Sequence, residues 1–429
     1  MGYNFFNVTK VKDSFKVKIN QFLQSLGPAI RNGEDITFAD NDITYALKLQ
    51  HDRIKDKGLD VEYQMYERDK EPTSILVGQN WADAHYESAV CFKEIGVKRT
   101  VFKDCKKIFK DDRKTVSYQT ITDVRTGTHP DDENYCCPSC GSVAKVSELV
   151  NGCPYCGIRY KMDDLFPKVT GFYFLNDVGM TGREGKKGMG LFVSITTVSS
   201  LLIYFISSAI QNTGHMNGGK IFGLIAGAIG ITFLGAFCGY LLFSFYLLMR
   251  LITTGISESS KMGTAGSRSK FEKRMKVLSP EFSFEYFTSK AVSLVKTTIF
   301  ARDEQDLLLY SGSPVNPAFK DIIDLNYGGA LGIAGFDDKD GVTTVWADIF
   351  FDVLYYNEDK IKPRNQVFRA VLQRRSDIPV NLNFSMTRIQ CPTCASSFDA
   401  TKNKICPSCG HPYELIHDDW VLVDLKVKK

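Results

Sequence analysis

The 429-residue sequence has almost no excess of charge of either sign. It contains 53 Lys and Arg against 49 Asp and Glu, which leaves a formal net charge of +4. Domains that bind nucleic acids are usually strongly basic. The balanced charge therefore gives no reason to expect a nucleic-acid partner.

Cysteine is too scarce for a disulfide scaffold. The chain has 12 Cys, and eight of them form four C-x2-C pairs, a pattern that indicates metal binding in a reducing compartment. The N-terminus lacks the continuous apolar core of a cleavable signal peptide. Phe6 occupies the position at which a myristoylation motif needs Ser or Thr. We therefore expect neither secretion nor this lipid anchor.

Recognisable catalytic motifs are also lacking. None of the six His belongs to a dyad or triad pattern. General acid–base catalysis needs a carboxylate, His or Tyr facing a cavity, and the candidates Asp348, Asp352 and Tyr355 have the spacing of ordinary strand residues. We expect the protein not to be an enzyme.

Two long apolar runs are present. Residues 189–210 and 221–249 contain no charged side chain, and about 20 apolar residues suffice to cross a bilayer. The alternative is a pair of buried core helices, but runs of this length favour membrane spans. The sequence predicts a transmembrane helical hairpin over residues 189–252, with the lipid bilayer as one partner.

Basic residues flank this hairpin on the side of the long polar segments. Because Lys and Arg accumulate on the cytoplasmic side, we expect a two-pass protein of the cell membrane with both termini in the cytoplasm. Residues 253–279 are rich in Ser, Gly and basic residues and predict a flexible basic linker, solvated or resting on anionic headgroups. The basic residues are Arg183, Lys186, Lys187, Arg250, Lys261, Arg268, Lys270, Lys273, Arg274 and Lys276.

The second apolar run carries a ridge of small residues at multiples of four. Such a ridge lets another helix approach closely. It can pack against the first run, where Thr196, Ser200 and Ser208 have the same spacing, or against a second copy of the chain in a homo-oligomer. The ridge consists of Gly223, Gly227, Gly235 and Gly239.

The four cysteine pairs form two sets with zinc-ribbon spacing, C-x2-C-x12-C-x2-C and C-x2-C-x11-C-x2-C. Two tight turns that each present two thiolates can close a tetrahedral sulfur shell, so we expect two structural zinc ions; iron or a redox role is the alternative. His129, Cys136 and His411 lie beside the sets, and we expect them not to be ligands. The expected ligands are Cys137, Cys140, Cys153, Cys156, Cys391, Cys394, Cys406 and Cys409.

The chain around each cysteine set reads as strands. Apolar residues alternate with polar ones over 380–387 and 421–428, on either side of the second set. Strand-like segments at 100–109, 114–124 and 169–178 surround the first set in the same order. Two strands, a ribbon and a closing strand thus occur twice, which suggests an internal duplication.

Each half opens with helical material. Asp13 or Ser14 is a potential cap for a helix that Asn32-Gly33 ends, and Ser279-Pro280-Glu281 is a good start for another. The residues expected to share one face of the first helix are Ile19, Phe22, Leu23, Leu26 and Ile30. The fold class is therefore α+β: two cone-like helix-plus-antiparallel-sheet lobes, each with a zinc ribbon in a β-hairpin, joined by the membrane hairpin. The expected domains are 1–180 with a ribbon at 136–157, 189–252, 253–279, and 280–429 with a ribbon at 391–410.

The second half resembles a known family in the order of its elements and its aromatic opening helix, FSFEYFTSKAVSLVKTTIF, followed by strands through VTTVWADIFFDVLYY and VFRAVLQRR. It is similar to the mitochondrial inner-membrane translocase tether (subunit-44-like) domain of the nuclear-transport-factor-two-like superfamily. The resemblance covers 281–390 and 415–427 and implies a domain that binds membranes and proteins, without catalytic residues. The cysteine set before the closing strand departs from the family's pattern.

These features favour a membrane-anchored scaffold that presents two zinc-stabilised cytoplasmic lobes to a protein partner. One alternative is a small-molecule or catalytic pocket within a lobe. Another is nucleic-acid binding through the ribbons, but the loops ASSFDATKNKI and GSVAKVSELVNG hold only three Lys between them. Transport is disfavoured because two uncharged spans leave no site within the membrane unless the protein oligomerises.

Overall fold

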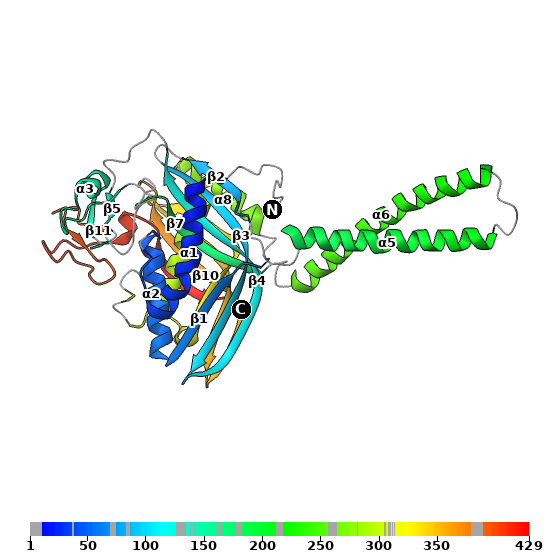
Figure 1. The fold of residues 1–429 in the computed structure, drawn as a ribbon. Coiled ribbons are helices and arrows are strands. Elements are labelled where there is room, and N and C mark those ends of the chain that lie inside the picture. The colour runs from blue at the N-terminus through cyan, green and yellow to red at the C-terminus, as the bar shows by residue number, and fades with distance from the viewer. Residues whose placement is uncertain are drawn as a thin grey trace. The chain divides into compact units, whose positions relative to one another are not determined.

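The structure is a computed structural model of the chain (Figure 1). It divides into two compact units, Met1–Asn176 with Lys261–Lys429, and Asp177–Ser260. The described residues are 11–428 except 37, 69–73, 83–85, 126–133, 138, 141, 162–164, 177–181, 212–217, 256–263, 281, 304–305, 308–309, 311, 313 and 379–388. The strand predicted over 380–387 lies outside them.

The N-lobe, residues 11–176, places two helices against an antiparallel sheet. The sheet has the order β1-β3-β4-β7, with β2 paired to β3. It belongs to the α+β class that the sequence predicts. The elements are α1 (Asp13–Asn32), α2 (Asn41–Asp56), β1 (Leu59–Tyr66), β2 (Leu76–Ala82), β3 (Tyr86–Lys103), β4 (Lys106–Val124) and β7 (Lys168–Asn176).

Helix α1 forms because apolar residues recur on one face. Ile19, Phe22 and Leu26 are fully buried. Gly33 ends the helix in the left-handed conformation, with φ of 72°, and donates its N–H to the carbonyl of Ala29. The predicted face and C-terminus are confirmed, but the predicted N-cap is wrong, since the helix begins at Asp13 after Lys12 and no side chain caps it.

The C-lobe, residues 264–428, repeats the meander. Its sheet has the order β8-β9-β10-β13, all antiparallel neighbours. The elements are α8 (Thr264–Leu278), α9 (Phe284–Phe300), η1 (Pro317–Asp321), β8 (Ile322–Lys339), β9 (Val342–Asn357), β10 (Lys360–Arg375), η2 (Leu415–His417) and β13 (Val421–Val427).

Three local predictions need correction. Residues 264–278, assigned to a flexible linker, form helix α8, because Phe271 and Met275 are buried in the core of the C-lobe. Helix α9 begins at Phe284, with the Ser283 side chain as its cap, and not at Ser279. The predicted strand over 100–109 is instead the end of β3 and the start of β4, separated by Asp104 and Cys105.

The two cysteine sets lie on small structural pieces between the third and fourth strands of each meander. The first tetracysteine segment, residues 134–161, connects β4 to β7, and the second, residues 389–413, connects β10 to β13. Both strand pairs are antiparallel. The pieces are β5 (Asn134–Cys136), β6 (Val143–Lys145), α3 (Val146–Asn151), β11 (Ile389–Gln390) and β12 (Ser397–Phe398).

The two lobes pack against each other. Strand β7 forms an edge of the N-lobe sheet and β8 an edge of the C-lobe sheet. The Asn326 side chain on β8 donates to the carbonyl of Phe174 (2.8 Å) and accepts from its N–H (3.3 Å), which satisfies backbone groups of this edge. Helix α9 is buried over almost its whole length and also contacts α2. Each lobe has its own hydrophobic core, and each core includes residues of the other lobe: Leu49 in that of the C-lobe, and Ile323, Leu354 and Tyr356 in that of the N-lobe.

The other unit consists of α5 (Gly182–Gln211) and α6 (Gly218–Gly255). Within them, stretches of 24 and 29 residues are apolar enough to cross a membrane, and at 1.5 Å per residue they span about 36 and 44 Å, more than the ~30 Å hydrocarbon core. Phe222 and Phe233 are 75% and 74% exposed. Helices that expose such side chains are not buried core helices, and they fit a two-pass membrane protein.

Candidate metal centres and interlobe contacts

The first four predicted ligands converge. The Sγ atoms of Cys137 and Cys156 are 3.8 Å apart, as are those of Cys140 and Cys153. Two turns position them: Cys137 donates its N–H to the carbonyl of Ser142, and Cys153 to that of Ile158, both at 2.9 Å. All four Sγ atoms lie within 4.8 Å of one another.

The second four converge in the same way. The Sγ separations are 3.6 Å for Cys391 and Cys409 and 3.7 Å for Cys394 and Cys406. The N–H of Cys391 donates to the carbonyl of Ser396 (2.9 Å). These four Sγ atoms also lie within 4.8 Å of one another.

The turns after the cysteine pairs need left-handed backbone. Gly157 and Gly410 have φ of 74° and 76°. Gly157 donates its N–H to the carbonyl of Cys153, and Gly410 donates its N–H to the carbonyl of Cys406. Ala395 occupies the equivalent position after Cys394 with φ of 58°. Glycine adopts this conformation without steric cost, so the sequence pattern and the turn geometry agree.

Both groups have the dimensions of a metal shell. A disulfide would need about 2.05 Å between sulfurs, far less than the observed 3.6–3.8 Å. A tetrahedral ion with metal–sulfur bonds of ~2.3 Å places its sulfurs about 3.8 Å apart. The residues therefore fit a tetrahedral ion, and four sulfurs leave it no open position for water or substrate.

Hydrogen bonds lower the pKa of one thiol in each group. Burial acts to raise the pKa of Cys140, but side-chain and backbone hydrogen bonds with Ser142 outweigh it and lower the pKa to about 6. The Ser396 side chain lies 3.3 Å from Cys406 Sγ and lowers its pKa to about 6 as well. Because the thiolate is the metal-binding form, both groups favour cation binding.

The neighbouring candidate ligands take different positions. Among the described residues, the two groups that could hold a metal contain four cysteines each and do not include His411. His129 and the side chain of Cys136 lie outside the described part of the chain. Cys91 is buried, Cys105 sits in the turn between β3 and β4, and Cys238 is exposed on α6.

The two tetracysteine segments touch each other. The Val143 N–H on β6 donates to Ser397 Oγ on β12 at 2.8 Å. Figure 1 shows β5, α3 and β11 together at one end of this unit. Local sequence offers no signal for this contact, because the two residues are 254 positions apart.

The tetracysteine segments also expose apolar side chains. Val150, Tyr155 and Ile158 are exposed on the first segment, and Ile405 is exposed on the second. A contiguous exposed apolar patch marks an interaction site, whereas single exposed apolar residues are common. Outside the two spans, the described large hydrophobic residues that are exposed are Val17, Tyr66, Val150, Tyr155, Ile158, Val277 and Ile405.

Three glycines of the predicted ridge face the first span. A Cβ on Gly235 would lie 2.8 Å from Thr197 Cα, and one on Gly239 would lie 2.6 Å from Val193 Cα. A Cβ on Gly227 would meet the Tyr204 hydroxyl at 2.0 Å, whereas one on Gly223 would meet nothing within 4 Å. The structure thus uses the ridge mainly for packing within the hairpin.

Thr196 strengthens this packing. Its Oγ1 lies within hydrogen-bonding distance of the Gly235 carbonyl on α6, at 2.9 Å. Glycine at this position lets the backbone of α6 come close enough for the bond.

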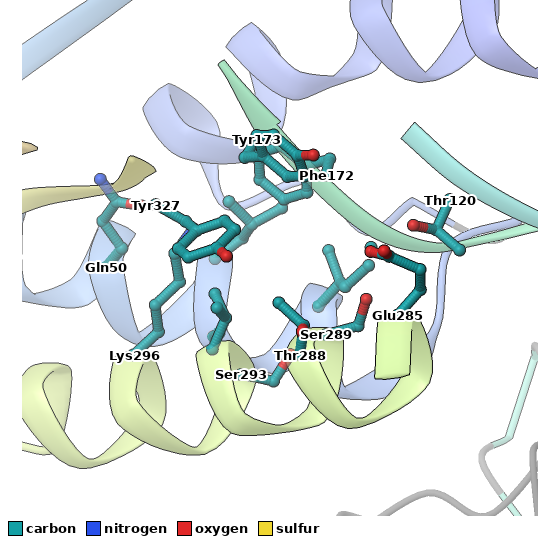
Figure 2. A pocket seen from close by; sticks show the side chains of 15 residues that line it. Gln50, Thr120, Phe172, Tyr173, Glu285, Thr288, Ser289, Ser293, Lys296 and Tyr327 are labelled. Carbon is teal, nitrogen blue, oxygen red and sulfur yellow. The ribbon is translucent and has the colours of Figure 1, made fainter. Parts of the chain in front are cut away.

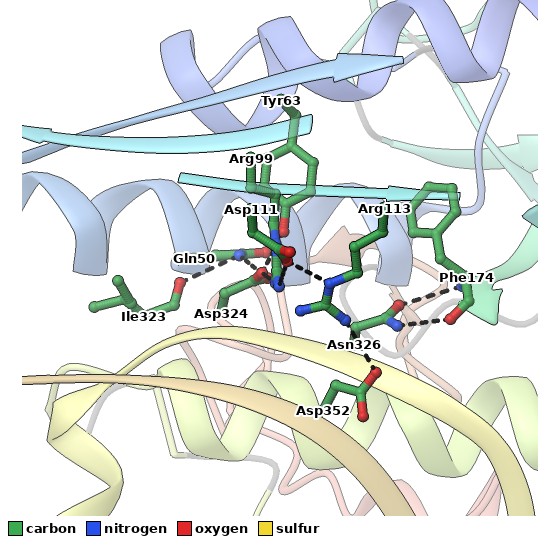
Figure 3. Close-up of polar contacts among 10 residues, drawn as sticks. All are labelled: Gln50, Tyr63, Arg99, Asp111, Arg113, Phe174, Ile323, Asp324, Asn326 and Asp352. Carbon is green, nitrogen blue, oxygen red and sulfur yellow. Dashed lines mark hydrogen bonds and ion pairs between the residues drawn. The ribbon is translucent and has the colours of Figure 1, made fainter. Parts of the chain in front are cut away.

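The lobe interface contains a buried polar cluster that the sequence analysis missed (Figure 3). Arg99 on β3 forms an ion pair with Asp324 on β8, and both side chains are 7% exposed. Gln50 donates to Asp324 at 2.9 Å, and the Tyr63 hydroxyl also donates to it. Burial acts to raise the pKa of Asp324, but Arg99 and Tyr63 outweigh it, so the pKa is lowered. The carboxylate is fully engaged.

A second buried cluster joins α2, α9 and the segment before β13. Lys290 on α9 forms ion pairs with Asp42 on α2 and with Asp419, the latter at 3.2 Å. All three side chains are at most 6% exposed. Buried charges of this kind need partners to offset their lost hydration. The cluster thus depends on both lobes being in place.

The carboxylates considered for catalysis make structural contacts. Asp348 accepts two hydrogen bonds from Arg369, at 2.7 and 2.8 Å, and one from Lys428 at 2.7 Å. Asp352 lies 3.6 Å from the Arg113 guanidinium. The Tyr355 hydroxyl bonds to the side chain of Gln366.

Comparison of the chain with protein-family models, with curated proteins and with solved structures finds no match. The geometry of the sites is therefore the basis for function.

Proposed function

We propose that this protein is a scaffold of the cell membrane whose two tetracysteine segments bind one zinc ion each and dock a protein partner. The contact between the segments carries the proposal: Val143 bonds to Ser397, and both segments expose apolar side chains. Two tetracysteine segments held together by a hydrogen bond offer a partner a rigid surface. We propose that the exposed side chains Val150, Tyr155, Ile158 and Ile405 together form this surface, which we name the docking surface.

Zinc supplies rigidity in this proposal. Each tetracysteine segment has few regular elements, with strands of two or three residues. The first segment has a small core cluster that includes Val146 and Leu149, and residues Ile389 and Phe398 of the second are buried in the core of the C-lobe. Metal binding adds folding free energy to small pieces of this kind. A closed sulfur shell favours this structural role over catalysis. Zinc is preferred over iron because structural four-sulfur sites are typical of zinc.

Anchoring supports the scaffold role. The two candidate spans fix the chain in a bilayer, and the basic residues around them favour a cytoplasmic position for both termini. The resemblance of the C-lobe to the translocase tether domain, which binds proteins and membranes, agrees with this reading. The repeated order of strands around the two segments is consistent with duplication of one ancestral lobe.

Photo-crosslinking tests the docking surface. A photoreactive amino acid replaces Tyr155 or Ile405 in the full-length protein in its native membrane, and Tyr66 on β1 serves as the matched exposed control. We expect one discrete protein adduct from both docking positions and none from Tyr66. The adduct should disappear when Cys153 is changed to Ser. Equal labelling at all three positions contradicts the proposal.

A reporter fused to the C-terminus tests the orientation. We expect it to be cytoplasmic in the unmodified protein, and charge reversal at Arg183, Lys186 and Lys187 should disturb the topology. A C-terminus outside the cytoplasm would overturn this part of the proposal.

A further inference from the structure

A cavity lies between the two lobes, bounded by α2, β7 and α9 (Figure 2). It leaves about 30 Å³ for the centres of water-sized molecules, which is room for roughly two of them. Ile43, Leu47, Phe172 and Val292 give it an apolar wall. Its other lining residues include Lys296, Gln50, Tyr327 and a row of hydroxyls on α9.

Lys296 is the unusual member of this lining. Its side chain is 8% exposed, and no hydrogen bond or ion pair links its Nζ to any residue in the described part of the chain. Figure 2 shows the side chain rising from α9 beside Tyr327, toward Gln50. The Nζ lies 4.7 Å from the centre of the Phe172 ring, a cation–π contact. A buried ammonium without an anion is costly.

The carboxylates nearby do not satisfy Lys296. Asp324 attracts it, but Arg99, Tyr63 and Gln50 occupy that carboxylate. Glu285 also lines the cavity, and Arg268 holds it at 2.8 Å. Burial lowers the pKa of Lys296 to about 8, as expected for an ammonium that lacks a full counter-charge.

The remaining polar groups suit a small ligand. Ser289 and Ser293 line the cavity, and no hydrogen bond holds either hydroxyl among the residues described. Gly171 makes room beside Ser289, because a Cβ on this glycine would lie 2.2 Å from Ser289 Oγ. The cavity thus combines one cation, free hydroxyls and an apolar wall.

We propose that this cavity binds a small carboxylate, with the Lys296 ammonium as its counter-ion and the α9 hydroxyls as further donors. Its size limits the ligand to a few heavy atoms, as in formate or acetate. The methyl group of acetate lies against the apolar wall. Since the lobes form the cavity together, the bound carboxylate stabilises their contact. This goes beyond the docking role and leaves the tetracysteine segments untouched.

Saturation-transfer NMR with acetate tests the proposal on the full-length protein in deuterated detergent. We expect saturable binding to the wild type and at least a ten-fold loss of affinity in Lys296→Met, since the variant removes the charge-assisted hydrogen bond. Lys48→Met, at an exposed position on α2, is the matched control and should bind like the wild type. Ethylammonium, close to acetate in size but cationic, should not bind.

Two further readouts keep the test decisive. Gly171→Ala keeps the amine but fills the cavity beside Ser289, so it should also lose acetate binding. Lys296→Met should melt at the same temperature as the ligand-free wild type or higher, because it removes an uncompensated buried charge. The proposal is overturned by absence of saturable binding to the wild type, by unchanged affinity in Lys296→Met, or by unfolding of that variant.

Discussion

Val143 in the N-lobe donates its backbone N–H to the Ser397 side chain in the C-lobe, 254 residues later. This bond joins the two tetracysteine segments, so a structural change in one segment alters the stability of the other. The coupling is the physical basis for treating the segments as a single docking element.

Loss of the Ser397 hydroxyl should loosen the first metal centre. Ser397→Ala leaves the buried Val143 N–H without its acceptor, which costs about 1–3 kcal/mol. We expect a chelator to remove zinc from the first segment several-fold faster, as measured with a colorimetric zinc indicator. Ser408→Ala, at an exposed serine of the second segment, is the control. Equal release rates in both variants would show that the segments are independent.

Asp324 should be essential for joining the lobes. Asp324→Asn leaves the Arg99 guanidinium, 7% exposed, without its buried partner in the C-lobe, and such a loss costs about 3–5 kcal/mol. Asp321→Asn is the matched control, because its ion pair with Lys57 is half-exposed and contributes below about 1 kcal/mol. Urea unfolding of both variants in detergent measures the difference. Similar midpoints would contradict the role of this cluster.

Stability should rise at alkaline pH because of Lys296. Burial lowers its pKa from 10.5 to about 8, so between these pH values the unfolded chain binds more protons than the folded chain. Stability therefore increases with pH across this window, by up to about 3 kcal/mol. The charged and titratable groups around Lys296 are Asp324, Glu285, Tyr173 and Tyr327.

The comparison with Lys296→Met isolates this effect from other titrating groups. Urea midpoints of the wild type and the variant should converge as the pH rises from 8 to 10.5. If the difference between the two urea midpoints stays constant over this pH range, burial does not lower the pKa of Lys296.

The membrane hairpin should tolerate a larger side chain at Gly223, at one end of the glycine ridge, but not at Gly235. Gly235→Leu would drive a side chain into the Thr197 backbone, 2.8 Å from the new Cβ, and separate the two helices. Gly223→Leu, with open space at that position, is the control for added bulk. We expect a melting temperature several degrees lower for Gly235→Leu alone. If Gly223→Leu instead abolishes crosslinked dimers, the free end of the ridge joins two chains.

Sequence patterns predicted the features that depend on local spacing. The C-x2-C pairs specified both sulfur groups, and uninterrupted apolar runs specified both candidate spans. The periodicity of Ile19, Phe22 and Leu26 specified the buried face of α1. Each of these patterns involves residues that are close together in the sequence, so a single sequence is enough to recognise it.

Contacts between distant segments were not visible in the sequence. Lys290 and Lys296 are buried on α9, because α2 and β7 of the other lobe contact this helix, and no local pattern in the sequence indicates that burial. The turn at Asp104-Cys105 was missed because it lacks the usual Asn-Gly or Asp-Gly pair.

Native mass spectrometry of the full-length, detergent-extracted protein tests the central claim most directly. The account predicts two zinc ions per chain, and one after Cys153→Ser or Cys406→Ser, since each change removes a ligand from one sulfur group. A chain that carries no zinc, or that keeps both ions in these variants, would contradict it.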